Sequence, residues 1–184
     1  NQSASFGLPF ELSDTQLEQI LCALCTKHEM LRSGVKIDSG TVDMHVNAPE
    51  VFNFATSIYR EHSSCANFSD IDESIKQVQS SFEFSDTQLI KLLYIENTQS
   101  TPLLVVIVHH FVIDGVSWRI LVEDLDQLLC QLNCHDALDI GKSKNQYANA
   151  VQLLKGVTNE EKFKQDALYW QDVAKKQTYP ITKR

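Results

Sequence analysis

The chain of 184 residues is long enough for one domain, or for one lobe of a larger domain. Its composition, 43% hydrophobic and 22% charged, is ordinary for a globular protein, and no run approaches the ~20 apolar residues of a membrane span. The net charge of -8 argues against nucleic acid as a partner, because phosphate binding needs clustered Lys and Arg.

Strands and helices are predicted to alternate along the first part of the chain. Residues 3–12 are predicted to form a strand, and Ser13 then opens a helix through a capping box with Gln16. The apolar residues of this helix recur with a 3.6-residue period and predict one buried face: Leu17, Ile20, Leu21, Leu24 and Leu31. The elements expected next are strands at 35–38 and 41–46, a helix over 50–61, a loop at 63–70 and a helix over 71–81.

The second half continues this alternation. The elements expected there are strands at 88–96 and 103–108, a helix that begins near Ser117, a helix over 142–154 and a last helix opened by TNEE at 158–161. The run LLVVIV at 103–108 is apolar on both faces, as in a central strand covered from both sides. FELSDTQL at 10–17 nearly recurs as FEFSDTQL at 82–89, and we expect the first copy to lead into a helix and the second into a strand. The mixture favours an α/β sandwich.

The five cysteines give no clear metal pattern. Cys22 and Cys25 form a CxxC inside a helical pattern, and Cys130 and Cys134 lie beside His135 near the end of another. Zinc-binding pairs normally come from turns, so we expect no metal site and ordinary thiols in a reducing, cytoplasmic setting. Asn1 is not a natural start, which predicts that the segment belongs to a longer chain.

The stretch HHFVIDGVSW at 109–118 contains the residues best suited to chemistry. If the strand persists, His109 and His110 point to opposite faces, one into the interior and one out from the strand end, where open α/β sheets hold ligands. Periodicity alone does not say which is which. A neutral histidine there suits general-base work near pH 7. A serine nucleophile at Ser117 lacks the GxSxG setting, and a metal on two diverging histidines is also set aside.

The residues after the histidines predict a bend and the start of a helix. Gly115 would allow a tight turn or the close approach of a ligand. The helix N-terminus at Ser117 would favour an oxyanion or an enolate. We expect Asp114 to be structural: buried carboxylates are rarely left unpaired, and Arg32 is the partner we predict, in an ion pair that fixes the bend.

HHFVIDGVSWRILVEDL resembles the HHxxxDG signature of the condensation-domain superfamily of nonribosomal peptide synthetases. The continuation SWRIL is more similar to the epimerization branch than to the condensation branch. Three further stretches are similar to family segments: NQS at 1–3, KHEMLR at 27–32, and 146–170, with Tyr147 where tryptophan is expected.

This resemblance implies a chloramphenicol acetyltransferase-like α/β sandwich, with residues 1–184 as the N-terminal lobe of a two-lobed domain. It implies that His110 is the catalytic acid/base that inverts L to D at the Cα of an aminoacyl or peptidyl thioester. His109 would be a supporting residue, and Ser117 and Trp118 are candidates for the substrate tunnel. A glutamate of the absent C-terminal lobe would serve the opposite face, so the isolated segment is expected to be inactive.

The resemblance also implies the partners. The substrate would arrive on the phosphopantetheine arm of a peptidyl carrier protein, next to further synthetase domains, with no cofactor bound by this domain. Two alternatives stay open: a condensation domain that joins two carrier-bound substrates, and a non-catalytic carrier-docking module. A lobe without its partner is expected to expose an apolar patch and to self-associate.

Overall fold

The structure is a computed structural model that describes residues 1–49, 51, 53–63, 68–83, 88–97, 101–143, 147–158 and 161–176. The chain divides into two compact units, Asn1–Ser143 and Lys144–Arg184.

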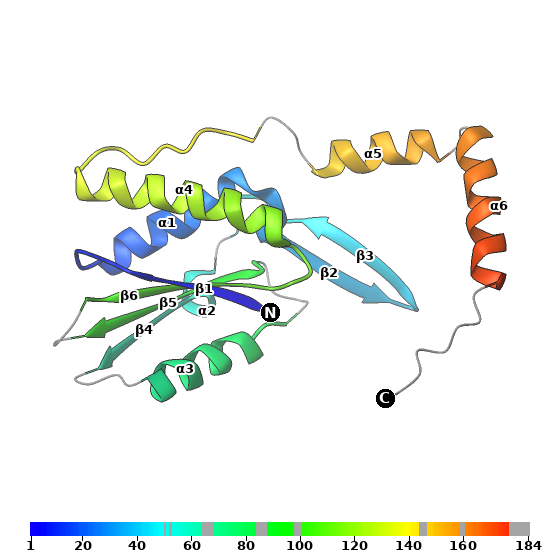
Figure 1. The fold of residues 1–184 in the computed structure, drawn as a ribbon. Helices are drawn as coiled ribbons and strands as arrows, with labels where there is room; N and C mark the ends of the chain where they lie inside the picture. The colour runs from blue at the N-terminus through cyan, green and yellow to red at the C-terminus, as the bar shows by residue number, and fades with distance from the viewer. Residues whose placement is uncertain are drawn as a thin grey trace. The chain divides into compact units, whose positions relative to one another are not determined.

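A four-stranded sheet forms the centre of the first unit (Figure 1). Its strands, in spatial order, are β1 (Gln2–Gly7), β6 (Leu103–Val108), β5 (Ile90–Asn97) and β4 (Ile58–Ser63). β4 runs parallel to β5, whereas β1 and β5 are both antiparallel to β6. β6 therefore lies between two neighbours, as its continuous apolar run predicts.

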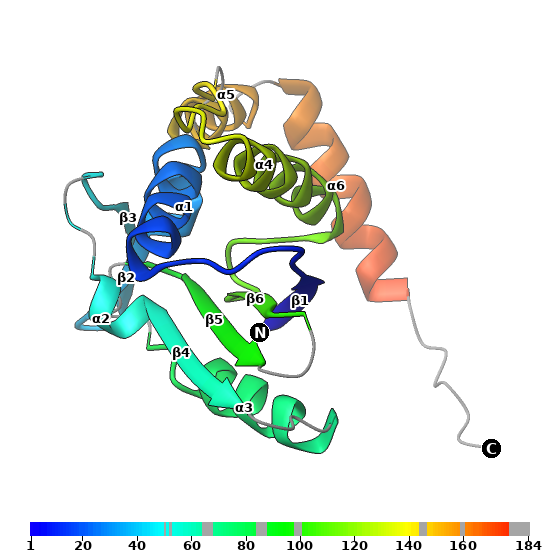
Figure 2. The same cartoon turned by 90° about the vertical axis from the view of Figure 1, so that its left-hand side faces the viewer.

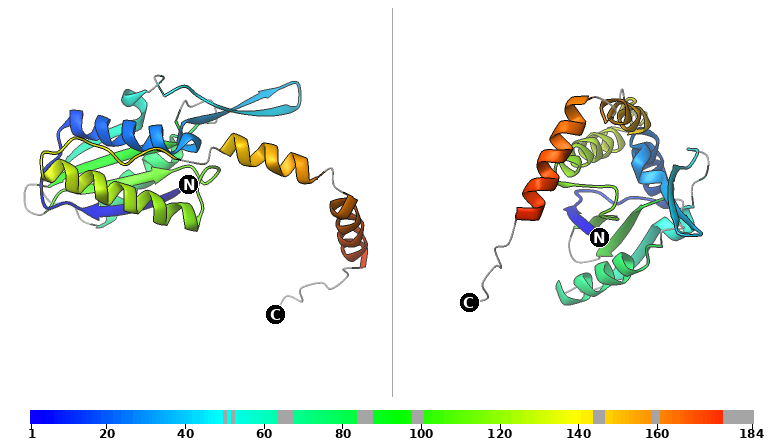
Figure 3. Two further views of the ribbon diagram at one scale, coloured as in Figure 1. Left: turned by 90° about the horizontal axis from the view of Figure 1, so that it is seen from above. Right: turned by 90° about the vertical axis from the view of Figure 1, so that its right-hand side faces the viewer.

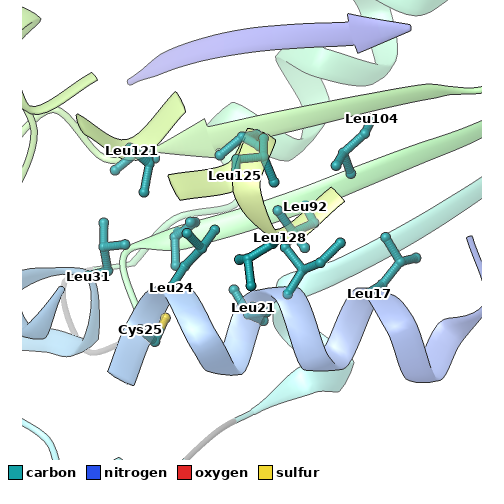
Figure 4. Packing of buried hydrophobic residues seen from close by; sticks show 14 of the residues in the cluster. Leu17, Leu21, Leu24, Cys25, Leu31, Leu92, Leu104, Leu121, Leu125 and Leu128 are labelled. Atoms are coloured by element: carbon teal, nitrogen blue, oxygen red, sulfur yellow. The ribbon is translucent and has the colours of Figure 1, made fainter. Parts of the chain in front are cut away.

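Helices cover both faces of this sheet. α1 (Asp14–Lys27) and α4 (Gly115–Asn133) lie over one face, and α3 (Phe68–Ser80) lies over the other (Figure 2). Alternate residues of β6 enter two separate hydrophobic clusters: Leu104, Val106 and Val108 on the α1/α4 side, Val105 and Ile107 on the α3 side. The larger cluster is a layer of leucines between α1, α4 and the strands (Figure 4). β6 is therefore covered from both sides, as its apolar run predicts, within an α/β sandwich.

Local sequence signals place α1 correctly. The Ser13 hydroxyl accepts the Gln16 N–H and the Gln16 side chain accepts the Ser13 N–H, so the predicted capping box is present. The helix ends at Lys27, however, and Leu31 is buried from the following 3₁₀ helix, η1 (Glu29–Arg32). β1 is likewise shorter than predicted and ends at Gly7, two residues before Pro9, which has no N–H for a sheet ladder.

The two strands predicted at 35–38 and 41–46 form as β2 (Ser33–Asp38) and β3 (Thr41–Val46), and they pair as a hairpin that extends away from the sheet (Figure 3). Its two turn residues, Ser39 and Gly40, both have positive φ, 48° and 83°. Such a turn matches the right-handed twist of the two strands it joins.

The prediction of a helix over 50–61 is wrong for most of its length. Only α2 (Phe54–Ser57) is helical, and β4 follows at once. β4 is an edge strand whose polar residues pair across the sheet, Arg60 and His62 both with Glu96 of β5. Such pairing is decided by a distant segment and leaves little local signal. The predicted loop at 63–70 is helical from Phe68, and its residues 64–67 lie outside the described part.

Two sequence predictions farther along are confirmed. α3 and β5 form where the helix over 71–81 and the strand over 88–96 are expected. The octamer copies also diverge as expected: the first enters α1, whereas Leu89, which ends the second, is followed directly by β5.

The second unit contains two helices, α5 (Tyr147–Val157) and α6 (Glu161–Lys176). α5 begins later than the predicted 142–154. The predicted capping box joins Thr158 to Glu161, but the Thr158 hydroxyl donates to the Lys155 carbonyl at 2.8 Å, and residues 159 and 160 between them lie outside the described residues. Residue 146, the first of the stretch 146–170 that resembles the family, also lies outside them. Across the described chain, no helix is long and apolar enough to cross a bilayer.

Candidate functional site

β6 ends at Val108, so both histidines of the motif lie just beyond the strand. The His109 N–H still donates to the Leu89 carbonyl at 2.9 Å, and the ring is half-buried. The ring packs edge-on against Phe82 and Phe111, with centroids 5.8 and 6.4 Å away. His109 is therefore the inward-facing member of the pair.

His110 is the exposed member. Its Nδ1 lies 2.9 Å from the Ile113 carbonyl oxygen. A carbonyl can only accept, so Nδ1 carries the proton and donates it. In the neutral ring, Nε2 then keeps a lone pair, which is the form of imidazole that can remove a proton.

Gln2 is the residue that meets this lone pair. The register of β1 on β6 sets Gln2 opposite Val108, at the end of the sheet where the histidines begin. Gln2 Nε2 lies 3.3 Å from His110 Nε2, and Gln2 Oε1 lies 2.7 Å from the indole Nε1 of Trp118. The sequence analysis matched the segment around Gln2 to a family but gave the residue no role, because this contact depends on strand register.

Asp114 is exposed and caps α4. Its Oδ1 accepts the Ser117 backbone N–H at 2.8 Å and the Ser117 hydroxyl at 2.8 Å. These two bonds, the backbone one first, hold the pKa of the Asp114 carboxyl below its ordinary value. The bend before α4 is thus fixed locally.

The predicted ion pair between Arg32 and Asp114 is wrong. The Arg32 guanidinium donates to two backbone carbonyls instead, to Cys25 from Nε at 3.1 Å and to Asn47. Arg32 therefore joins the end of α1 to the residue after β3. Asp114 needs no cationic partner because water reaches it and Ser117 supplies its hydrogen bonds.

The structure also corrects the reading of Gly115 and separates the two tunnel candidates. A Cβ added to Gly115 would meet nothing within 4 Å, and its φ lies outside the left-handed region, so the bend itself does not require glycine. Ser117 serves the Asp114 cap. Trp118, by contrast, lines an open hollow beside Gln2 that Arg119 and Glu123 also border.

A buried lysine lies behind His109 and was missed by the sequence analysis. Lys91 of β5 is 2% exposed, and its ammonium donates to the Ser81 carbonyl and hydroxyl at 2.8 and 2.9 Å. The same ammonium lies 4.5 Å from the centroid of the Phe82 ring that packs on His109. The chain Lys91–Phe82–His109 thereby joins the loop to the α3 side of the sheet.

A second missed cluster joins α1 to α4. Asp124 is 6% exposed and accepts the Lys27 ammonium at 2.6 Å and His28 Nε2 at 2.7 Å. This carboxylate faces the interior beside Leu121, Leu125 and Leu128 of α4.

The described cysteines, Cys22, Cys25, Cys130 and Cys134, are all free thiols. Burial raises the pKa of Cys25, which disfavours the thiolate. No group of three or more His, Cys, Asp or Glu suited to holding a metal ion is present in the described residues.

Comparison with known proteins agrees with this geometry. The family model described as "Condensation domain" matches residues 1–183. Surfactin synthase subunit 2 of Bacillus subtilis (strain 168) is 27% identical over 187 residues, and bacitracin synthase 2 of Bacillus licheniformis is 25% identical over 159 residues. These alignments cover 100% and 86% of this chain but only 5% and 6% of the two synthases.

Two solved structures share the fold. The epimerization domain from the third module of tyrocidine synthetase B has a TM-score of 0.84 at 22% identity, covering 98% of this chain and 41% of that one. The first condensation domain of the calcium-dependent antibiotic synthetase has a TM-score of 0.74 at 16% identity, covering 98% and 43%. The predicted chloramphenicol acetyltransferase-like α/β fold is confirmed, and the chain spans about two fifths of these domains. The chain belongs to the condensation domain family.

Proposed function

We propose that this segment is the N-terminal lobe of an epimerization domain that inverts L to D at the Cα of an aminoacyl or peptidyl thioester. His110 is the acid/base. The observation that carries the proposal is the state of its ring: Nδ1 donates to the Ile113 carbonyl, and Nε2 keeps its lone pair at an exposed strand end. Support for the epimerization branch comes from SWRIL after the motif and from the fold match to an epimerization domain.

The chemistry follows from that lone pair. A thioester makes the adjacent Cα–H acidic, so Nε2 can remove the proton, once the Gln2 amide N–H has moved off its lone pair, as charge moves onto the carbonyl oxygen. Return of a proton to the opposite face completes the inversion and needs a second acid/base group. By the family resemblance, a glutamate of the C-terminal lobe supplies it, and the thioester arrives on the phosphopantetheine arm of a peptidyl carrier protein, with no cofactor bound by the domain.

The proposal is tested in the intact enzyme that contains this segment. A carrier loaded with an aminoacyl thioester is incubated in D₂O, and mass spectrometry follows the deuterium that enters at Cα. We expect exchange in the wild type and a loss of about 10²–10⁴-fold in His110→Ala, the range for a general base. His135→Asn is the matched control, because His135 is exposed and Asn tolerates its positive φ of 58°. Exchange by His110→Ala at the control rate would remove His110 from the reaction.

Amide-bond formation between two carrier-bound substrates is the second candidate. The family model's description and the fold match to a condensation domain favour it. The same enzyme, given two loaded carriers, separates the candidates: a new amide with unchanged Cα configuration would replace epimerization with condensation. A non-catalytic docking role predicts neither product, with carrier binding that is indifferent to His110→Ala.

A further inference from the structure

The contacts around His110 form a chain of hydrogen bonds that begins at Trp118. Trp118 Nε1 lies 2.7 Å from Gln2 Oε1, Gln2 Nε2 lies 3.3 Å from His110 Nε2, and His110 Nδ1 lies 2.9 Å from the Ile113 carbonyl. The two ends of this chain have no choice of role. An indole N–H can only donate, and a backbone carbonyl can only accept.

The fixed roles of Trp118 and Ile113 determine which atoms of Gln2 and His110 donate and which accept. Because the indole donates, Gln2 must accept with Oε1, so its amide nitrogen faces His110 as a donor. Because Ile113 accepts, His110 must donate from Nδ1, so its Nε2 must accept. We propose that Gln2 and Trp118 are positioning residues that hold the His110 ring, in the tautomer that Ile113 sets, with its Nε2 facing the Gln2 amide N–H. This inference rests on the proposed role of His110 as the base.

The same chain leaves no acceptor for an N–H on Nε2. An imidazolium would set an N–H against the Gln2 N–H. Rotating the Gln2 amide would turn its NH₂ group toward the Trp118 N–H instead. Both arrangements lose one hydrogen bond, so Trp118 holds Gln2 in the orientation that suits a neutral base. The four members come from three elements: Gln2 from β1, His110 and Ile113 from the loop after β6, and Trp118 from the start of α4.

Substitutions at Gln2 distinguish this role from simple packing. Gln2→Glu has nearly the same shape and still accepts from Trp118, but its carboxylate demands a proton on Nε2. With Nδ1–H held by Ile113, His110 would then be locked as imidazolium. Gln2→Leu removes the partner but leaves the lone pair in place. If Gln2 has only a structural role, Gln2→Leu should lower turnover more than Gln2→Glu, because Leu loses the hydrogen bond from Trp118 and Glu keeps it.

The test uses the intact enzyme and measures kcat and KM for Cα exchange. We expect Gln2→Glu to lower kcat by about 100-fold or more, as when a general base is lost. Gln2→Leu and Trp118→Phe should each lower kcat by no more than about tenfold, the value of one hydrogen bond, with KM unchanged. Trp118→Phe should add no further loss to Gln2→Leu. Gln77→Glu and Trp170→Phe, at exposed sites on α3 and α6, are the matched controls.

The outcomes separate this inference from the proposed function. If His110→Ala keeps full turnover, both fail, since the two residues act through His110. If turnover depends on His110 but Gln2→Leu is as damaging as Gln2→Glu or more so, only the positioning role fails. If the enzyme forms amides without Cα exchange, epimerization fails, and the order of the Gln2 variants is read on amide formation instead.

Discussion

Among the carboxylates that the structure describes, Asp124 is the one whose loss should destabilise the fold most. Its side chain is 9% exposed, and it accepts one charge-assisted bond from Lys27 and one from His28. Hydrogen bonds to charged groups contribute about 1.5–3 kcal/mol each, and breaking a fully buried pair costs roughly 3–5 kcal/mol. Lys27 and His28 are about one-fifth exposed, so water rehydrates them in part after the substitution. We therefore expect Asp124→Ala to lower the free energy of unfolding by about 3 kcal/mol.

Urea unfolding at neutral pH measures this loss. If the free energy of unfolding falls by about 2 kcal/mol per M of urea, the loss of about 3 kcal/mol should lower the urea concentration at the unfolding midpoint by roughly 1.5 M. The slope of the free energy against urea concentration should stay constant. Asp126→Ala is the matched control, because Asp126 lies on the same helix but is exposed. That control should change the free energy by no more than about 0.5 kcal/mol.

A double-mutant cycle tests the assignment to Lys27. Lys27→Met alone leaves Asp124 with one partner fewer, whereas in the Asp124→Ala background it removes an ammonium that has lost its carboxylate. Lys27→Met should therefore lower the free energy of unfolding less in the Asp124→Ala background than in the wild type. The difference between the two losses, which is the coupling energy, should be about 1–2 kcal/mol. Equal costs for Asp124→Ala and Asp126→Ala, or a coupling near zero, would refute the reasoning.

Two further predictions concern bonds with a single partner. The lowered pKa of Asp114 means that its stabilising contribution is present above its ordinary value of 3.8 and is lost as pH falls through the folded value. The stability difference between wild type and Asp114→Asn, measured by melting from pH 7 to pH 3, should therefore shrink only at the acid end; a constant difference would contradict the cap. Tyr94→Phe should cost about 1–3 kcal/mol in urea unfolding, because the Tyr94 hydroxyl accepts the buried Leu12 N–H at 3.0 Å. An unchanged midpoint would show that Leu12 finds another acceptor.

The parts of the fold predicted well are those whose cause lies within a few residues. The capping box at Ser13 and the apolar run of β6 are each decided locally. β4 was missed for the opposite reason: its strand conformation depends on pairing with β5, more than 30 residues later in the chain.

The Arg32–Asp114 prediction failed for a related reason. It assumed that Asp114 is buried and so needs a cation. A local signal for the correct answer was present, since an aspartate three residues before Ser117 at the start of a helix is a typical N-cap. Burial could not be read from the sequence, and the choice between a cap and an ion pair depends on burial.

The candidate site likewise contains contacts that are local in sequence and contacts that depend on strand pairing, and this difference has a functional consequence. Bonds inside the motif, from His110 to Ile113 and from Ser117 to Asp114, span three residues each, so the sequence HHFVIDGVS can shape the loop by itself. The Gln2 contacts to His110 and Trp118 span more than 100 residues and exist only after β1 pairs with β6. The motif therefore supplies the carbonyl that accepts from His110 Nδ1. Completion of the sheet adds the donor that holds the lone pair on Nε2, so a segment with the motif but a displaced β1 would retain the loop and lose the positioned base.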